Sequence, residues 1–290
     1  MRIHHLNCGS LRKIPLLDEE LTAAATDREL AAVCHCLLIE TDSDGLVLVD
    51  TGLGTADLRD AERSLGADWV AYAQPVLDPE ESALRQVARL GYAPQDVRHI
   101  VLTHLHRDHT GGLPDFPHAR VHVHPDEYRA VTDPVAAHHR HSLDHFMPAH
   151  RAHDPLLTPA RVDADLNADV RSEWFGFPGV ARPQGLECEL LLVPLPGHSA
   201  GHAGVAVRDD EGRWLLHGGD AYMYHGELEH TPALSHPVLD PVQQGAQTDA
   251  AARLGTRDRL RGLCRDRADA VTVFSAHDPW EFARLATPTG

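Results

Sequence analysis

The segment His104–His109 reads HLHRDH and places three imidazoles and one carboxylate within six residues. Histidine nitrogen and aspartate oxygen are common ligands of zinc and other divalent ions, and one turn-like loop can present several of them to the same centre. Taken alone, the segment also fits a polar loop whose histidines are solvated. Donors elsewhere in the chain must therefore decide between a metal site and a polar loop.

Three further donors each follow an apolar run: His198 in PGHSAGH, Asp220 in HGGDA and His277 in SAHD. A single histidine at a strand end is usually a structural group, but three such positions in addition to HLHRDH are difficult to explain in that way. The combined set has five imidazoles and two carboxylates, which is enough for two divalent ions. The candidate metal ligands are His104, His106, Asp108, His109, His198, Asp220 and His277.

Short apolar runs precede these donors and read as strands, with turn formers and helical patterns between them. TDSDG separates the first two runs into a hairpin, and Asp78–Pro79 begins a helix that is expected to end at Gly91. This order predicts an α/β sandwich whose two halves share a core and whose strand-end loops meet at one edge. The predicted strands are Ala32–Glu40, Leu46–Asp50, His99–Thr103, Arg120–His124, ECELLLVPL, HAGVAVRD, RWLLHGGD and AVTVFSAHD, and the predicted helices include Pro125–Val131 and about Pro241–Arg267.

Residues 132–185 lose clear periodicity and read as an insertion. One interpretation is a lid over the metal site, whose aromatic side chains wall an apolar pocket. An equally weighted alternative is a solvated loop whose aromatics pack on the main core or on another subunit, and a third metal ion in this segment is disfavoured. The histidines and aromatics concerned are His138, His139, His141, His145, His150, His153, Phe146, Trp174, Phe175 and Phe177.

Acidic residues outnumber basic residues by 43 to 26, so the formal charge is −17. A surface of this charge repels nucleic acids and anionic membranes, and no apolar run reaches the roughly 20 residues of a membrane helix. The N-terminal segment lacks a signal-peptide core, so we expect a cytoplasmic protein. Five scattered cysteines argue against a disulfide framework, and the triplet CHC at Cys34–Cys36 is expected to be buried in a strand rather than to bind metal.

The ordered set HLHRDH, GHSAGH, GGDA and SAHD, preceded by LVDTG, resembles the metallo-β-lactamase superfamily. The resemblance covers nearly the whole chain and implies an αββα sandwich forming a single domain over residues 1–290, with the insertion at about 132–185. It also implies that Asp50 orients a ligating imidazole. The implied ligand sets are His104, His106 and His198 for one ion, Asp108, His109 and His277 for a second ion, and Asp220 as the bridge between them.

Two divalent ions in such a centre can share a water molecule and lower its pKa, so that hydroxide exists at neutral pH. We expect this bridging hydroxide to attack a carbonyl, and Asp108 to pass a proton to the leaving group. Zinc is the first expectation for both ions, and iron, manganese and cobalt also suit imidazole and carboxylate ligands.

Within the superfamily, the full set of seven ligands resembles acyl-homoserine lactonases and glyoxalase II thioesterases. The lactonases carry a substrate-binding tyrosine three residues after the bridging aspartate, where this chain has Met223. Tyr222 and Tyr224 flank that position, so either of them, or neither, contacts the substrate. Only 13 residues follow His277, so no basic helical domain is evident to hold a glutathione thioester.

The sequence thus predicts a dinuclear hydrolase of a small lactone or related ester, resembling acyl-homoserine lactones. The alternatives are a thioester hydrolase of the glyoxalase II type, a mononuclear iron persulfide dioxygenase, and a non-catalytic metal protein that senses a ligand. The expected partner is a small-molecule substrate, with neither nucleic acid nor membrane. The oligomeric state is left open, with a homodimer as one option.

Overall fold

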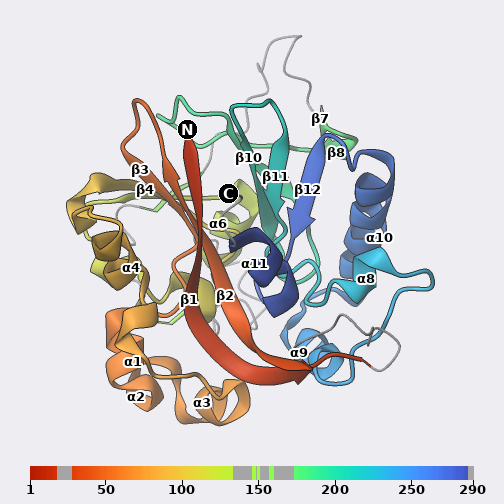
Figure 1. Cartoon of the computed structure of the whole chain (residues 1–290), viewed down its shortest axis with the longest axis horizontal. Helices are drawn as coiled ribbons and strands as arrows, with labels where there is room; N and C mark the ends of the chain where they lie inside the picture. Colours follow the sequence, from red (N-terminus) through yellow and green to blue (C-terminus); the bar gives the residue numbers. More distant parts are fainter. Residues whose placement is uncertain (18–27, 133–145, 148, 151–156, 160–172, 287–290) are drawn as a thin grey trace.

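Two mixed β-sheets form the centre of the molecule in a computed structural model that describes residues 1–17, 28–132, 146–147, 149–150, 157–159 and 173–286 (Figure 1). The first sheet contains, in order, β1 (Arg2–Pro15), β2 (Glu29–Glu40), β3 (Leu46–Val49), β4 (Val97–Val101), β5 (Arg120–Val123) and β6 (Leu157–Pro159). The second sheet contains, in order, β12 (Val271–Phe274), β11 (Trp214–His217), β10 (Ala203–Arg208) and β9 (Leu190–Pro194). A two-stranded ribbon joins β7 (Glu173–Trp174) to β8 (Phe177–Pro178).

Each sheet contains both antiparallel and parallel strand pairs. In the first sheet, β1, β2 and β3 are antiparallel neighbours, while β3 to β6 run parallel. In the second sheet, β9, β10 and β11 are antiparallel and β11 pairs parallel with β12. Since β3 and β4 are parallel neighbours, as are β11 and β12, the loops after each pair open at the same edge of their sheet.

The space between the sheets is filled by alternate side chains of their facing strands. Leu37 and Val49 of the first sheet lie in one buried cluster with Leu192, Val205 and Phe274 of the second. Many of the remaining alternate residues of each sheet face outward and pack against helices, whereas others, in β1 for example, face solvent. The sheets therefore pack face to face on a shared apolar core.

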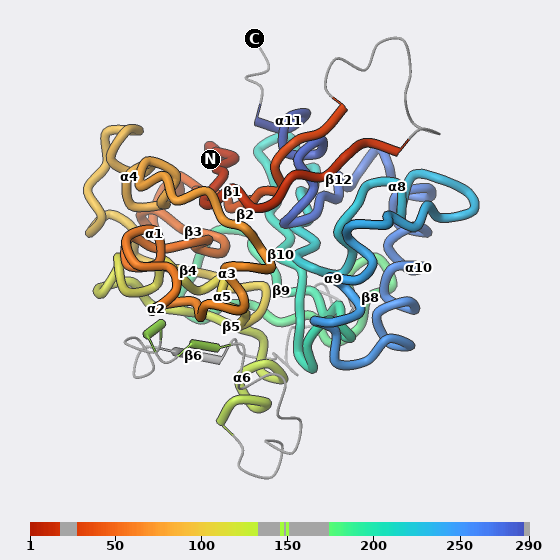
Figure 2. The backbone as a smooth tube through the Cα atoms, turned by 90° about the horizontal axis from the view of Figure 1, so that it is seen from below, coloured from red at the N-terminus to blue at the C-terminus, as the bar shows by residue number. Residues whose placement is uncertain are grey.

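Helices cover both outer faces, so the αββα sandwich predicted from the sequence is confirmed (Figures 1 and 2). On the first sheet, Val87 of α4 packs with Leu48 and Ile100, and on the second, Leu260 of α10 packs with Leu216. The helices are α1 (Thr55–Arg59), α2 (Ala61–Leu65), α3 (Ala67–Ala73), α4 (Ala83–Arg89), α5 (Arg107–Thr110), α6 (Pro125–Thr132), α8 (Gly226–Glu229), α9 (Leu239–Ala246), α10 (Ala250–Asp266) and α11 (Pro279–Ala286).

Several element boundaries differ from the sequence prediction. The helix expected from Pro79 is a 3₁₀ turn over Pro79–Glu81, after which Ser82 caps α4 by accepting a hydrogen bond from the backbone N–H of Arg85. The single helical stretch expected near the C-terminus is two helices, because Asp249 accepts from the N–H of Ala252 and so starts α10 anew. Neither β1 nor the three short helices α1 to α3 were predicted from the sequence.

Most of the predicted insertion falls outside the described residues, including His138, His139, His141, His145 and His153. His150, which is described, is buried, and its Nε2 lies 3.0 Å from Asp57 Oδ1. The buried aromatics Phe146, Trp174 and Phe177 pack on the two outer cores. This part of the segment therefore agrees with the alternative in which the aromatics pack on the main body. Within the described part of the chain, no helix is long and apolar enough to span a membrane.

Candidate metal centre

Five loops that follow strands bring the predicted ligands together. Asp50 follows β3, the segment His104–His109 follows β4, and His198, Asp220 and His277 follow β9, β11 and β12. Backbone hydrogen bonds hold these loops in place. The N–H of Ala203 donates to the carbonyl of Thr103 at 3.0 Å and so connects the two sheets, and the N–H of Ala276 donates to the carbonyl of Gly219 at 3.0 Å within the second sheet. The loops are thus held by sheet edges rather than by their own side chains alone.

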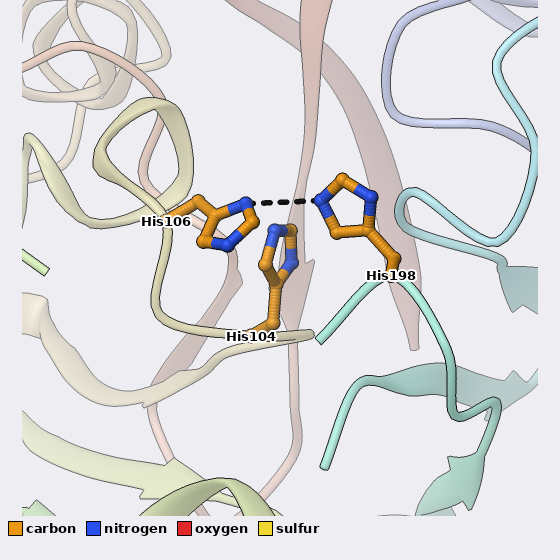
Figure 3. A group of neighbouring side chains, drawn as sticks. All are labelled: His104, His106 and His198. Atoms are coloured by element: carbon orange, nitrogen blue, oxygen red, sulfur yellow. Dashed lines mark hydrogen bonds between the residues drawn. The ribbon is translucent and has the colours of Figure 1, made fainter. Parts of the chain in front are cut away.

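The first ligand group contains His104, His106 and His198 (Figure 3). One nitrogen from each ring lies within 4.8 Å of the others, and His106 Nδ1 is 2.9 Å from His198 Nε2. All three rings are buried. Two of them come from the loop after β4 and the third from the loop after β9, so the group spans both sheets.

The second ligand group contains Asp108, His109 and His277, whose ligand atoms also lie within 4.8 Å of one another. Asp108 Oδ1 is 3.9 Å from His109 Nε2, and its Oδ2 is 3.6 Å from His277 Nε2. Asp108 is more exposed than the two imidazoles, with a side chain that is 16% accessible. Its carboxylate therefore faces the open side of the centre.

Asp220 lies between the two groups, with one oxygen toward each. Its Oδ2 is 3.1 Å from His198 Nε2 and 4.0 Å from His104 Nε2. Its Oδ1 is 3.3 Å from His109 Nε2 and 3.2 Å from His277 Nε2. This is the arrangement that a carboxylate needs in order to bridge two cations.

The residues present fit a pair of divalent ions by two tests. Among the described residues, His104 Nε2, His109 Nε2 and Asp220 Oδ1 are buried without hydrogen-bond partners, which is costly for polar atoms unless a further group satisfies them. The donors are imidazole nitrogens and carboxylate oxygens, a set that suits zinc, iron, manganese or cobalt. Each of the seven predicted ligands lies in the converging groups, while the metal-binding role itself stays a prediction.

Electrostatics within the centre favour a charged carboxylate surrounded by imidazoles. Burial raises the pKa of Asp220, but His277, His109 and His198 outweigh burial and hold that pKa well below its usual value. Burial lowers the pKa of His109, yet Asp220 and Asp50 outweigh it and raise that pKa well above the usual value. Burial, followed by the neighbouring rings of His109 and His106, lowers the pKa of His104 well below the usual value.

Groups outside the centre fix the orientation of the ligating rings. His109 Nδ1 lies 2.8 Å from Asp50 Oδ2, and Asp50 also accepts hydrogen bonds from the N–H and hydroxyl of Thr103, each at 2.8 Å. His198 Nδ1 lies 2.9 Å from Gln243 Oε1, and His277 Nδ1 donates to the carbonyl of Val33 at 2.8 Å. Each contact turns the opposite nitrogen of the ring toward the centre, which is the role expected of Asp50 from the sequence.

Gln243, which was not predicted as a site residue, connects two parts of the centre. Its side-chain amide donates to the carbonyl of Asp220 at 2.9 Å while its oxygen faces His198. His202 accepts a hydrogen bond from the backbone N–H of Asp220 at 2.9 Å and leaves no room for a side chain at Gly219, where an added Cβ would lie 2.5 Å from its Nε2. No sequence motif marks Gln243, because it lies in α9 and reaches the centre only through the fold.

An apolar cavity of about 270 Å³ opens onto the ligand groups. Its lining includes the apolar side chains of Trp69, Tyr72 and Met223 together with Asp108 and Asp220 of the ligand groups. β1 and α3, which were not predicted, supply much of the wall, so these residues carried no recognisable signal in the sequence.

Neither tyrosine that flanks Met223 is among the residues that line this cavity. The hydroxyl of Tyr222 donates to the carboxylate of Glu281 at 2.9 and 3.1 Å, in the core beneath α10. Tyr224 is fully buried and its ring packs against His236 and Trp280, with centroid separations of 4.5 and 6.0 Å. The structure therefore brings Met223, rather than either phenol, to the ligand groups. The hydroxyl of Ser199, in the same loop as His198, donates to the carboxylate of Glu127 at 2.7 Å.

Comparison with known proteins yields one family and several relatives. The model of the Metallo-beta-lactamase superfamily matches residues 31–261. The chain is 40% identical to a probable metallo-hydrolase of Mycobacterium tuberculosis, with 100% of this chain and 84% of the relative covered. It is 36% identical to an N-acyl homoserine lactonase, AttM, of Rhizobium johnstonii, with 82% of this chain and 80% of the relative covered.

Solved structures share the fold at low sequence identity. An N-acyl homoserine lactone hydrolase with N-hexanoyl-L-homoserine at its catalytic metal centre superimposes with a TM-score of 0.62 at 20% identity, covering 98% of this chain and 95% of that one. A dizinc quorum-quenching lactonase, AidC, gives a TM-score of 0.57 at 16% identity, covering 94% of this chain and 92% of that one.

Proposed function

The chain belongs to the metallo-β-lactamase superfamily, and from that premise we propose that it is a two-metal hydrolase that opens a small lactone or a related ester. The observation that carries this proposal is the position of Asp220. One of its oxygens lies 3.1 Å from an imidazole of the first ligand group and the other lies 3.3 and 3.2 Å from imidazoles of the second. A site for one ion would not need a carboxylate shared in this way.

Two divalent ions held by these groups would supply the chemistry of the reaction, lowering the pKa of a water molecule and polarising the carbonyl that it attacks. The protein's own residues then have three tasks. Asp220 and the five imidazoles would bind the two ions and balance part of their charge. Asp108, at the exposed side of the centre, is the carboxylate available to hand a proton to the leaving oxygen. The apolar walls keep bulk water away from the reacting carbonyl.

The size and lining of the cavity support a small, largely apolar substrate. Its volume of about 270 Å³ is near the lower end of the usual range for ligand pockets. Trp69, Tyr72 and Val242 offer contacts for a short acyl chain or ring. The names of several relatives further support a lactone, and an acyl-homoserine lactone is one member of that class.

Metal analysis followed by a substrate panel tests this function. Purified protein should bind two ions per chain, of which we propose zinc as the first candidate, and removal of the ions with a chelator should abolish hydrolysis. The panel contains N-hexanoyl-homoserine lactone, γ-lactones, S-lactoylglutathione and, in an oxygen electrode with iron present, glutathione persulfide. Turnover of lactones is the expected result.

Three other outcomes would overturn the proposal in distinguishable ways. Faster turnover of S-lactoylglutathione than of any lactone would assign a thioesterase. Oxygen consumption with one iron per chain and no hydrolysis would assign a dioxygenase. Binding of lactones without any product, under every metal supplied, would assign a protein that senses its ligand.

A further inference from the structure

Two arginines line the cavity above the ligand groups in a chain that has an excess of acidic residues. Arg12 comes from β1 and Arg107 from the first position of α5. The guanidinium of Arg12 lies 4.8 Å from the ring centroid of Tyr72, and that of Arg107 lies 5.9 Å from the ring of Trp69. Because both rings belong to α3, two cationic side chains are fixed along one wall of the same cavity.

The guanidinium of Arg12 uses only part of its hydrogen-bonding capacity to hold this position. Arg12 donates through one Nη to the carbonyl of Tyr72, and Arg107 donates through one Nη to the carbonyl of Leu65. A guanidinium has five N–H donors. Donors of Arg12 therefore remain after its side chain has been anchored.

The Nε–H of Arg12 is buried and has no hydrogen-bond partner within the part of the chain that the structure describes. Nor does any carboxylate in that part form an ion pair with Arg12, whereas Arg85, Arg208 and Arg284 all pair with glutamates. A buried charged donor without an acceptor is costly, and an acceptor on a ligand removes that cost. Arg12 thus has the features of a residue that binds an anionic group of a ligand.

The carboxylates that line the cavity do not serve as hydrogen-bond acceptors for Arg12. Its lining carboxylates, Asp108 and Asp220, both belong to the ligand groups and would be committed to the ions. Most of the remaining wall is apolar and includes Leu11, Met223 and Val242. A substrate anion that enters the cavity would therefore meet a fixed guanidinium in a poorly solvated setting, where a charge-assisted hydrogen bond is strongest.

We propose that the substrate of this hydrolase carries a carboxylate, separated from its reacting ester or lactone carbonyl, and that Arg12 binds this carboxylate with Arg107 beside it. This inference rests on the proposed function and narrows its substrate class. It favours an ester or lactone of a dicarboxylic acid over a neutral acyl-homoserine lactone. Arginine suits the task because its planar fork binds both oxygens of a carboxylate.

A matched pair of chromogenic esters tests the proposal with the zinc-loaded protein. Mono-p-nitrophenyl adipate and p-nitrophenyl hexanoate have the same chain length and leaving group, and only the adipate ester carries a terminal carboxylate. We expect the wild-type protein to prefer the adipate ester by about tenfold or more in kcat/KM, mainly through KM. Arg12→Gln should reduce that preference about tenfold, and Arg12→Lys, which keeps the charge, should restore part of it.

Arg259 provides a control, because it also stacks on an aromatic ring and donates to a backbone carbonyl but lies away from the metal cavity. Its guanidinium lies 4.1 Å from the ring of Phe177 and donates to the carbonyl of Gly176 at 2.9 Å, but it does not line the metal cavity. Arg259→Gln should keep the wild-type preference. An equal loss of preference in Arg259→Gln and Arg12→Gln would mean that the effect comes from lost packing.

Calorimetry with two unreactive probes separates this proposal from the proposed function. Adipamate carries a carboxylate and hexanamide does not. Arg12→Gln should weaken binding of adipamate about tenfold and leave that of hexanamide unchanged, whether or not either ester is hydrolysed. If no ester is hydrolysed but this difference is found, the hydrolase assignment fails and the carboxylate site stands. If adipamate binds equally to both proteins, or wild type does not prefer the adipate ester, the carboxylate site is refuted.

Discussion

The five ligand imidazoles can be compared with a second group of histidines, His5, His35 and His217, which we call the interior histidine cluster. Both groups lie mostly out of solvent, and both bring imidazoles from distant parts of the chain into contact, in strand-end loops in the ligand groups and in strands in the interior histidine cluster. In the interior histidine cluster, His5 Nδ1 lies 2.8 Å from His35 Nε2, and His217 Nε2 donates to the carbonyl of His35 at 2.5 Å. The ring of His35 also packs on Phe274, with a centroid separation of 4.5 Å.

The two groups differ in their charged neighbours. In the interior histidine cluster, burial lowers the pKa of His5 to about 4 and that of His35 well below its usual value, so these rings pack as neutral groups. In the metal centre, Asp220 outweighs burial and raises the pKa of His277. Among the described residues, every converging group of metal-binding side chains lies in the metal centre. Carboxylates and strand-end loops, rather than the number of imidazoles, thus distinguish a cation site from packed histidines.

The strongest test of this comparison is Asp220→Asn. The amide keeps the shape of the side chain but removes the charge that faces imidazoles of both ligand groups, so we expect both ions to be lost. Turnover should fall by at least about a hundredfold, since even partners behind the ligands cost up to that much. Metal content by mass spectrometry and hydrolysis rates measure the two losses together.

The matched control for that variant is His35→Gln in the interior histidine cluster. It should retain both ions, although its stability falls through lost packing. Two bound ions in Asp220→Asn, or loss of ions in His35→Gln, would contradict the distinction drawn between the two groups.

Asp50→Asn tests whether the carboxylate behind a ligand is also required. Asp50 accepts from Thr103 and faces His109 Nδ1, so the amide cannot satisfy all of these donors. We expect affinity for the second ion to fall roughly 10–100-fold, as measured by competition with a chromogenic chelator. Asp44→Asn serves as the control, because Asp44 is a buried aspartate that accepts two backbone N–H groups far from the ligands. Equal effects of the two substitutions would show that Asp50 acts only on stability.

The sequence pointed to the candidate metal centre because its donors sit in short loops directly after strongly apolar strands, in a fixed order. The αββα sandwich could be predicted for the same reason. The strands that begin near Leu46, His99 and Leu190 are apolar enough to be recognised from the sequence alone. The strand β1 could not be recognised in this way. Its sequence RIHHLNCGSLRKIP contains charged and polar residues among the apolar ones, because part of the strand faces solvent. Polar strands of this kind are recognised only through their pairing partner, here β2.

The cavity wall could not be predicted for a related reason. Trp69 and Tyr72 lie in a helix of seven residues, too short for a periodic pattern, and they meet Arg12 only because β1 passes alongside. The expectation for Tyr222 and Tyr224 rested on a position in the chain relative to Asp220. In the structure that loop turns Met223 to the cavity, and the neighbouring side chains lie in separate cores.

Measuring stability as a function of pH tests whether the imidazoles of the interior histidine cluster are uncharged in the folded protein. The pKa of His5 is lowered to about 4 in the folded chain, whereas an unfolded histidine has a pKa near 6.5. Between these values the unfolded state binds a proton that the folded state does not, so the stability due to neutral His5 is present above pH ~6.5 and is lost as the pH falls toward ~4. The free energy of unfolding should therefore fall more steeply with acid in wild type than in His5→Gln.

Between pH 7 and pH 5, the free energy of unfolding should fall by about 1–2 kcal/mol more in wild type than in His5→Gln, allowing for the partly exposed ring. Urea unfolding of both proteins with a chelator present measures it without a contribution from ion release. Parallel curves for the two proteins would mean that His5 is already protonated in the fold.

The smallest expected effects come from Tyr222→Phe and Tyr224→Phe. The hydroxyl of Tyr222 donates to Glu281, a carboxyl whose pKa burial raises to about 8, so its removal should cost about 1–2 kcal/mol of stability. The hydroxyl of Tyr224 is buried without a partner among the described residues, so its removal should leave stability unchanged or slightly higher. Because neither phenol lines the cavity, kcat/KM should stay within about twofold of wild type in both variants. A large loss of kcat/KM in one variant, without loss of stability, would show that its phenol reaches the substrate after a rearrangement of the loop after β11.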